Sequence, residues 1–252
     1  MTGGAPVLSD FYRLTRFETV GSTNDEAKKL ARIGEPEGAL VWAAAQSSGR
    51  GRRGRPWQSP PGNLYLSLLL RPAGSAAQAA QLGFVAALAL GDALAPSLGT
   101  VHSLRFKWPN DVLLDGMKVA GILLESETAA DEGVAFVVVG IGVNLASAPS
   151  GTEFPATSLA AAGIAGVTPA LLLEGFAHHF EPWHRRWLDE GFGPMRRAWL
   201  ARASGLGEAV RVRLERATLF GRFLDLDEEG AMLLEAEDGR RRVAAGEVFP
   251  AA

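Results

Sequence analysis

The sequence of 252 residues contains no cysteine, which excludes disulfide bonds and thiolate metal sites. An excess of positive charge is also missing, because the formal net charge is −3 at pH 7. General nucleic-acid-binding proteins usually present a basic face, so this charge disfavours that class. The longest nearly apolar stretch, 76–95, is interrupted by polar residues, whereas a membrane span needs about 18 or more apolar residues. We therefore expect a cytoplasmic protein with no membrane partner.

Acidic residues are absent from position 38 to position 91, and four arginines lie close together within that stretch. Residues 46–57 read Gln-Ser-Ser-Gly-Arg-Gly-Arg-Arg-Gly-Arg-Pro-Trp, and we call 47–57 the arginine loop. Guanidinium groups stay charged and bind carboxylate or phosphate oxygens in pairs, while glycine allows close approach of the backbone. The pattern predicts a loop that binds an anion and that no neighbouring carboxylate in the sequence neutralises.

Two nucleotide-binding motifs resemble this loop and fail on inspection. Residues 49–54 satisfy Gly-x-Gly-x-x-Gly, but that turn must open a helix, and the prolines from Pro56 onward break the next segment. A Walker loop is excluded because Arg55 and Pro56 stand where its lysine and hydroxyl residue belong. A basic surface loop that touches RNA remains an open alternative.

The hydrophobic pattern predicts an α+β fold, a mixed β-sheet with flanking helices. The expected strands cover 11–20, 38–46, 63–71, 104–108, 119–127 and 135–145. The expected helices cover 27–33, 76–95 and a segment from 169 towards 186. Thr23 and Glu26 have the spacing of a capping box, and Thr168 with Pro169 is typical of a helix start.

The pattern changes near 203–207, after which short strands alternate with turn sequences. These strands are expected at 210–214, 217–226, 231–236 and 240–245. Such a meander predicts a small SH3-like β-barrel. We accordingly expect a catalytic domain over 1–205 and a C-terminal domain over 206–252.

A polar cluster, Lys-Trp-Pro-Asn-Asp at 107–111, follows one expected strand. Its proline predicts a turn that projects Asn110 and Asp111 from the rim of the sheet. Lys118 begins the returning strand, so Asp111 and Lys118 could face each other across the mouth of a hairpin. The residues alone leave open the alternative that Asn110 and Asp111 only cap a turn and that Lys118 is a solvated strand end.

Glycines at 140 and 142 alternate inside an apolar strand that ends at Asn144. Glycine within a strand often marks a place where a ligand lies against the backbone, and Asn144 could hydrogen-bond that ligand or simply form a turn.

A histidine group further on looks like a metal site. We expect no metal there, because Pro182 should interrupt the helix and leave solvated histidines; the group comprises His178, His179, Glu181 and His184.

Five motifs in one order closely resemble the biotin–protein ligases, with similarity from about Arg16 to the C-terminus. They are Gly-Ser-Thr-Asn at 21–24, the arginine loop, Lys-Trp-Pro-Asn-Asp at 107–111, Lys-Val-Ala-Gly-Ile at 118–122 and Gly-Ile-Gly-Val-Asn-Leu at 140–145. The resemblance implies the class II synthetase-like catalytic domain of biotin and lipoate ligases, followed by the SH3-like domain. Lipoate ligases and octanoyl transferases are the alternative within this fold.

The resemblance implies a reaction in two steps. Biotin reacts with ATP, which brings Mg²⁺, to give biotinyl-5′-AMP, and a lysine of the biotin carboxyl-carrier domain of a biotin-dependent carboxylase then takes the biotinyl group. By motif position, biotin would contact Ser22, Thr23, Asn24, Gln46, Arg50, Gly51, Arg52 and Lys118. The adenylate would contact Arg52, Arg53, Trp57, Asn110 and Asn144. Catalytic roles would fall to Arg50, Lys118 and Asp111, the last by positioning or deprotonating the acceptor lysine.

Regulatory members of this family carry an N-terminal DNA-binding domain. Only about twenty residues precede Gly21, which is too few for a helix-turn-helix domain, so we expect a monofunctional ligase that does not bind DNA. We also expect exposed sheet edges near 135–145, which would allow a homodimer by strand pairing.

Overall fold

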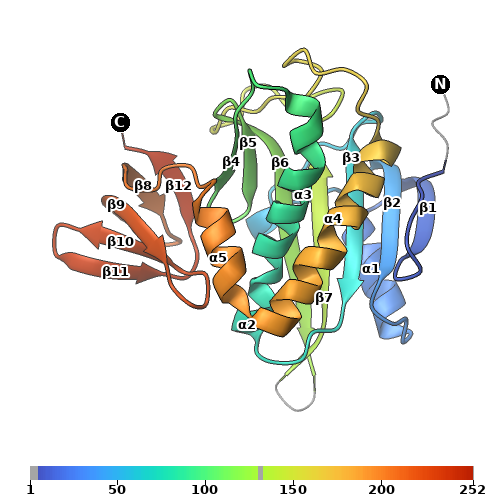
Figure 1. Ribbon diagram of the computed structural model, residues 1–252, viewed down its shortest axis with the longest axis horizontal. Helices are drawn as coiled ribbons and strands as arrows, with labels where there is room; N and C mark the ends of the chain where they lie inside the picture. Colours follow the sequence, from blue (N-terminus) through green and yellow to red (C-terminus); the bar gives the residue numbers. More distant parts are fainter. Residues whose placement is uncertain (1–4, 130–132, 252) are drawn as a thin grey trace.

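The computed structural model describes residues 5–129 and 133–251, and its larger part is a mixed sheet of seven strands (Figure 1). The strands are β1 (Arg13–Val20), β2 (Ala39–Gln46), β3 (Leu64–Leu70), β4 (Leu104–Lys107), β5 (Asp111–Leu114), β6 (Met117–Thr128) and β7 (Val134–Val143). Their order is β1-β2-β3-β7-β6-β5-β4, with β1 and β2 parallel and the other neighbours antiparallel.

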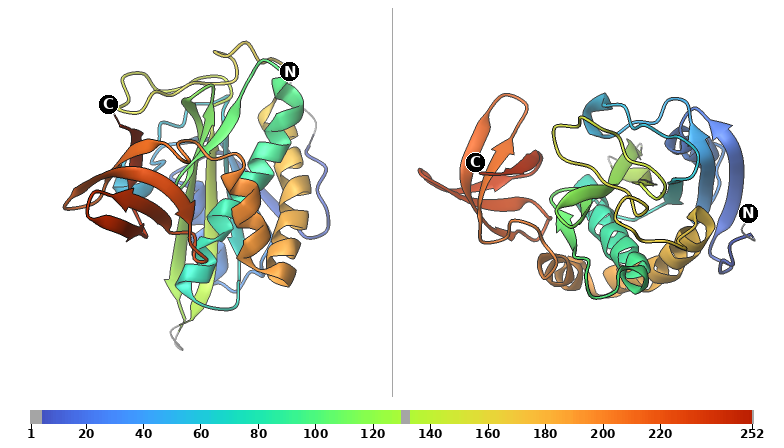
Figure 2. Two further views of the ribbon diagram at one scale, coloured as in Figure 1. Left: turned by 60° about the vertical axis from the view of Figure 1, so that its left-hand side comes forward. Right: turned by 90° about the horizontal axis from the view of Figure 1, so that it is seen from above.

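Helices cover both faces of this sheet (Figures 1 and 2). They are α1 (Thr23–Arg32), α2 (Ala76–Ala80), α3 (Leu82–Leu98), α4 (Pro169–Glu190) and α5 (Phe192–Leu200). Successive side chains of a strand point to opposite faces of the sheet, so one strand contributes apolar residues to both faces. Leu40 and Trp42 of β2 join the core under α3 and α4, whereas Val41 between them joins the smaller core under α1. The mixed sheet with flanking helices confirms the predicted fold class.

The apolar segment 76–95 forms two helices that meet at Gln81. Its side chain is buried, accepting a hydrogen bond from Trp187 and donating one to the carbonyl of Glu228. By length and composition Ala76–Leu98 would suffice to cross a membrane, contrary to the prediction, but most of its apolar stretch is buried inside the protein. It is the central core helix pair of this fold.

Three local predictions about helices are wrong. The cap of α1 is Ser22, so Thr23 and Glu26 form no capping box, and Thr23 uses its polar atoms on Gln46 instead. Pro182 lies inside α4 without ending it. His184 is not solvated, because its ring stacks between Phe180 and Trp187 in the core, and burial lowers its pKa. Tertiary packing here outweighs the local helix-breaking tendency of proline.

The predicted exposed edge at 135–145 is also wrong. β7 is hydrogen-bonded to β3 on one side and to β6 on the other, so it lies inside the sheet. The strands at the ends of the sheet are β1 and β4. A homodimer stays a prediction, but its expected strand is not available for pairing.

A second sheet of five antiparallel strands follows α5 (Figure 2). Its strands are β8 (Ala209–Arg213), β9 (Thr218–Leu226), β10 (Met232–Ala236), β11 (Gly239–Val243) and β12 (Glu247–Pro250), in the order β11-β10-β9-β8-β12. Its β9–β10 turn packs into the first sheet unit, where the indole of Trp108 donates to the carbonyl of Gly230 at 3.0 Å. A side chain at Gly230 would lie 2.7 Å from Phe84, so only glycine fits this contact. The small β unit was predicted.

Candidate active site

A cavity of about 450 Å³ lies where the two sheet units meet, and all five sequence motifs line it. The N-terminus of α1 and the arginine loop form part of the wall, and β6 and β7 contribute the glycines and apolar residues. Two segments outside the sequence motifs complete it, the loop 149–156 and the start of β12 together with the preceding Gly246. Segments far apart in the sequence therefore converge on one site.

At α1 the cavity wall consists of buried polar groups. Ser22, Thr23 and Asn24 are each almost fully buried. The backbone N–H and the hydroxyl of Thr23 both donate to Oε1 of Gln46, at 2.8 and 3.1 Å. Ser67 of β3, which lies outside the sequence motifs, places its hydroxyl 2.8 Å from Thr23 Oγ1 and 2.6 Å from Asn24 Oδ1. These fixed donors and acceptors suit a small polar ring.

The two strand glycines make room for side chains of this protein. A Cβ at Gly140 would lie 2.1 Å from Oδ1 of Asn24, and a Cβ at Gly142 would lie 2.6 Å from Nε1 of Trp57. The glycine pattern predicts a ligand against this backbone, and in the structure Asn24 and Trp57 lie there. Nε1 of Trp57 is buried without a hydrogen-bond partner, and the Trp57 side chain forms part of the cavity wall.

Two lysines share one buried carboxylate at the 107–111 motif. Asp111 begins β5, which the sequence analysis took for a turn, and Nζ of Lys107 and Nζ of Lys118 lie 2.8 and 2.5 Å from its two oxygens. Burial favours a raised pKa for Asp111, but the ammonium groups of Lys118 and Lys107 outweigh it and hold that pKa below its ordinary value. Asp111 therefore stays ionised, and Lys118 faces it rather than solvent.

The side-chain amides of Asn110 and Asn144 both hydrogen-bond to backbone carbonyls of the protein. The amide of Asn110 donates to the carbonyl of Ile122 at 2.8 Å, and its Oδ1 lies 3.5 Å from Nη1 of Arg52. The amide of Asn144 donates to the carbonyl of Thr157 at 3.0 Å. Both residues line the cavity, so their contacts with an adenylate stay predictions that involve their remaining polar atoms.

The arginine loop has no acidic sequence neighbour, but carboxylates from distant parts of the chain pair with it. Arg50 pairs with Asp25 and Glu125, and Arg55 pairs with Glu247. Sequence-distant acids thus neutralise two of its cations, which no local pattern could reveal.

The other two loop arginines differ from this pair. Nη1 of Arg52 donates to the carbonyl of Gly246 at 3.0 Å, and burial together with the charge of Arg53 lowers its pKa. No carboxylate forms an ion pair with Arg52 among the described residues. Arg53 is exposed and does not line the cavity, while Gly51 lines it and donates its N–H to the carbonyl of Arg55. Arg52 is therefore the loop cation best placed to receive an anion.

Several aromatic and acidic residues of the cavity lie outside the sequence motifs. Nζ of Lys107 lies 4.1 Å from the ring centre of Phe154 and 5.9 Å from that of Phe249. Glu247 and Glu153 both pair with Arg213. These residues belong to a surface loop and to the second sheet, where neither spacing nor periodicity marks them as part of a site.

Comparisons with known proteins agree with this geometry. The model of the biotin/lipoate A/B protein ligase family matches residues 17–144, and the model of the biotin protein ligase C-terminal domain matches 205–249. The chain is 48% identical over 233 residues to the biotin–[acetyl-CoA-carboxylase] ligase of Paracoccus denitrificans, covering 90% of this chain and 96% of that one. It is 34% identical to the bifunctional ligase/repressor BirA of Bacillus subtilis, covering 92% of this chain and 72% of the relative.

Solved structures give the same result. The biotin protein ligase from Aquifex aeolicus in complex with biotin and ATP superposes with a TM-score of 0.78 at 27% identity, covering 94% of this chain and 97% of that one. The biotin protein ligase from Leishmania major in complex with biotinyl-5-AMP gives a TM-score of 0.66 at 25% identity, covering 95% and 98%.

Proposed function

This chain belongs to the biotin/lipoate A/B protein ligase family, and we propose that it is the enzyme that joins biotin to a carrier protein in two steps. In the first step, an oxygen of the biotin carboxylate bonds to the α-phosphorus of ATP. The bond from that phosphorus to the bridging oxygen breaks, which gives biotinyl-5′-AMP and pyrophosphate. In the second step, a lysine amine of a biotin-dependent carboxylase carrier attacks the acyl carbon, AMP leaves, and the amine loses a proton.

The observation that carries this proposal is the convergence of the five motifs on one cavity with an excess of cations. Five cationic side chains line it against three carboxylates; the cations are Arg50, Arg52, Arg55, Lys107 and Lys118, and the carboxylates are Asp111, Glu153 and Glu247. The two substrates of the first step are both anions and repel each other. Fixed cations reduce that repulsion and stabilise charge that grows on the α-phosphoryl oxygens.

Each part of the cavity has chemistry suited to one part of the adenylate. Thr23, Asn24 and Gln46, with Ser22 beside them, present the donors and acceptors that the ureido ring of biotin needs. Arg52 and Lys118 take the carboxylate and α-phosphate, with Arg50 and Gly51 behind them on the loop. Trp57, Asn110 and Asn144 take the nucleotide. Arg53 belongs to this last group only if the exposed part of the loop closes over the adenylate.

Asp111 acts in this scheme by positioning rather than by proton transfer. Lys118 and Lys107 keep its pKa low, so it is a weak base for an incoming ammonium group. As a fixed anion between two lysines, it orients Lys118 and can attract the cationic acceptor lysine. The role of a base stays open to test by the pH dependence of the transfer step.

We assign Mg²⁺ to the triphosphate of ATP. The cavity carboxylates Asp111 and Glu247 already pair with lysine or arginine, and the described residues contain no group of three potential metal ligands. Mg²⁺ loses its waters reluctantly, so in this cavity most of its ligands would be water molecules and phosphate oxygens. Its contribution would be neutralisation of phosphate charge.

The experiment for this proposal is incubation of the full chain with biotin, Mg-ATP and a purified biotin carboxyl-carrier domain. Intact mass should show one added biotinyl group on a single lysine of the carrier, with release of AMP and pyrophosphate. The same incubation with lipoate or octanoate tests the alternative within the family. Absence of biotin transfer to several active acceptors would overturn the proposal, and transfer of lipoate instead would reassign the substrate.

A further inference from the structure

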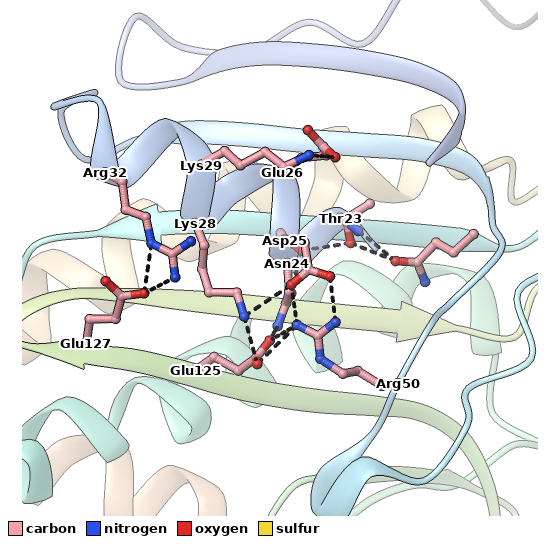
Figure 3. A network of polar contacts seen from close by, with 12 residues as sticks. Thr23, Asn24, Asp25, Glu26, Lys28, Lys29, Arg32, Arg50, Glu125 and Glu127 are labelled. Carbon is pink, nitrogen blue, oxygen red and sulfur yellow. Dashed lines mark hydrogen bonds and ion pairs between the residues drawn. The ribbon is translucent and has the colours of Figure 1, made fainter. Parts of the chain in front are cut away.

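Arg50 is held by carboxylates from two separate elements (Figure 3). Its Nη1 and Nη2 donate to the two oxygens of Asp25 on α1, at 2.8 and 2.7 Å. Nη2 also donates to both oxygens of Glu125 on β6, at 2.8 and 3.1 Å. Bidentate pairing is the strongest arrangement between arginine and carboxylate and fixes the plane of the guanidinium. Arg50 thereby ties the arginine loop to both a helix and a strand.

The charges in this group cancel. Nζ of Lys28 lies 3.1 Å from Asp25 and 3.1 Å from Glu125, so two cations face two anions. Arg50 lines the cavity, whereas Asp25 and Glu125 lie behind it and do not. A neutralised arginine is a weaker receptor for a substrate anion than Arg52, which has no carboxylate pair among the described residues. The contacts of Arg50 are those of an anchor.

Glu125 also connects this anchor with the polar wall at α1. Nδ2 of Asn24 donates to Oε2 of Glu125 at 2.7 Å, and Oδ1 of Asn24 lies 2.6 Å from the hydroxyl of Ser67. That hydroxyl also reaches Thr23, which in turn donates to Gln46. A chain of hydrogen bonds therefore joins the arginine loop with the residues proposed to bind the ureido ring.

We propose that Asp25 and Glu125 are positioning residues for the ligase reaction, which fix the arginine loop through Arg50. Glu125 additionally couples the position of the loop to the wall that receives biotin. This inference rests on the proposed function for its catalytic consequence, but the anchoring itself can be measured without substrate. Loss of either carboxylate should free the loop, weaken biotin binding and let the adenylate escape.

The chain provides matched controls for both positions (Figure 3). Glu26 lies on the same helix as Asp25 and pairs with Lys29 at 2.7 Å. Glu127 lies on the same strand as Glu125 and pairs with Arg32. Neither control carboxylate contacts the arginine loop in the structure. Glu26→Gln and Glu127→Gln therefore remove an ion pair from the same elements without releasing Arg50.

The first test is digestion of the ligand-free protein with trypsin, which cleaves after arginine and lysine. Asp25→Asn and Glu125→Gln should each raise cleavage after Arg52 or Arg53 by roughly tenfold, about the effect of one charge-assisted hydrogen bond. Both control variants should cleave at the wild-type rate. Unchanged cleavage in the first two variants, or an equal rise in the controls, would overturn the anchoring role.

A double-mutant cycle tests whether the carboxylates act through Arg50. In an Arg50→Gln background, adding Asp25→Asn or Glu125→Gln should not raise cleavage further, because the anchor is already lost. An additive rise would mean that the carboxylates hold the loop by another route. The cycle compares rates within one background, so it remains decisive if a variant is somewhat less stable overall.

The catalytic test compares the effect of each variant on substrate binding with its effect on the rate of the chemical step. Both variants should raise KM for biotin and the release of free biotinyl-5′-AMP by about tenfold, with a smaller change in single-turnover adenylation at saturating substrates. A loss confined to kcat, or wild-type retention of the adenylate, would contradict the proposal. If the wild type and the controls form no adenylate, the proposed function fails, and the trypsin comparison still decides the anchoring.

Discussion

At the scale of single residues, the sharing of one carboxylate by two lysines sets the charge of the reaction centre. Asp111 offsets one of the two ammonium groups, so the trio keeps a net positive charge, to which Arg52 adds another. Burial lowers the pKa of Lys107 despite the attraction of Asp111. The charge is held by short contacts before substrate arrives, so little reorganisation is needed as phosphoryl charge develops.

Lys118→Ala should reduce single-turnover formation of biotinyl-5′-AMP by roughly 10²–10³-fold, the loss typical of one such electrostatic donor. Transfer from preformed adenylate should fall less, because that step builds less phosphoryl charge. Folding should be little affected, since Asp111 keeps Lys107 as its partner. Lys29→Ala, on the exposed side of α1, is the control. An unchanged adenylation rate would return Lys118 to a purely structural role.

The strand glycines allow biotin and nucleotide binding to be weakened separately. Gly140→Ala would push against Asn24 and should raise the Kd for biotin, while Gly142→Ala would push against Trp57 and should raise the Kd for ATP. Each substitution would displace one side chain, and the two side chains line different parts of the cavity. Isothermal titration measures both constants. Gly193→Ala, where 3.5 Å to Arg197 leaves room, is the control, and equal effects on both ligands would refute this division.

At the scale of elements, the arginine loop is fixed at both ends. Gln46 and Ser59 are joined by a hydrogen bond at 3.0 Å across its base, and Trp57 donates its N–H to the carbonyl of Gly49. Between these points Arg50 pairs with its two carboxylates, and Arg52 and Arg55 contact Gly246 and Glu247. The loop is thus a part of the fold held by charge rather than by apolar burial, which makes its anchoring sensitive to pH.

The stabilising effect of Asp25 should disappear in acid. The hydrogen bond from Arg50 is the largest influence and lowers the pKa of Asp25 from 3.8 to about 2. A group whose pKa is lowered by folding stabilises the protein above its unfolded value, and this contribution is lost as the pH falls through the folded value. The difference in Tm between wild type and Asp25→Asn should therefore stay constant at neutral pH and shrink below about pH 4. A difference independent of pH would contradict the ion pair.

The elements themselves were largely predictable, because strands and helices follow from periodicity. Boundaries of β2, β3 and β9 lie within a residue of the predicted spans. The four-residue strands β5 and β12 were missed, since so short a run shows no period. The motifs predicted the biotin and nucleotide positions as candidates, but not Ser67 or Glu125. Those two enter the site only through strand pairing, which a single sequence does not display.

At the scale of the whole molecule, the cavity belongs to both sheet units. Gly246 and Glu247 of the second sheet bind Arg52 and Arg55 of the arginine loop, and Trp108 donates to Gly230. The second sheet therefore helps to position the loop, and we propose that 206–252 acts as a domain of the site. A ligand that fixes the arginine loop should therefore strengthen the contact between the two sheet units.

Biotin with Mg-ATP should accordingly raise the Tm of both units together. Ligand at about 100 times its Kd adds about 2.7 kcal/mol, which corresponds to a rise of about 5–10 °C for a protein of this size. The six tryptophans lie at 42, 57, 108, 183, 187 and 199, so their fluorescence reports the first unit and, through Trp108, its contact with Gly230. Far-ultraviolet circular dichroism reports the strands of both units. With ligand the two transitions should coincide, because an adenylate held by the loop cannot remain bound once the second sheet releases Arg52 and Arg55. A rise seen by fluorescence alone, with a separate unshifted transition in circular dichroism, would place the second sheet outside the site.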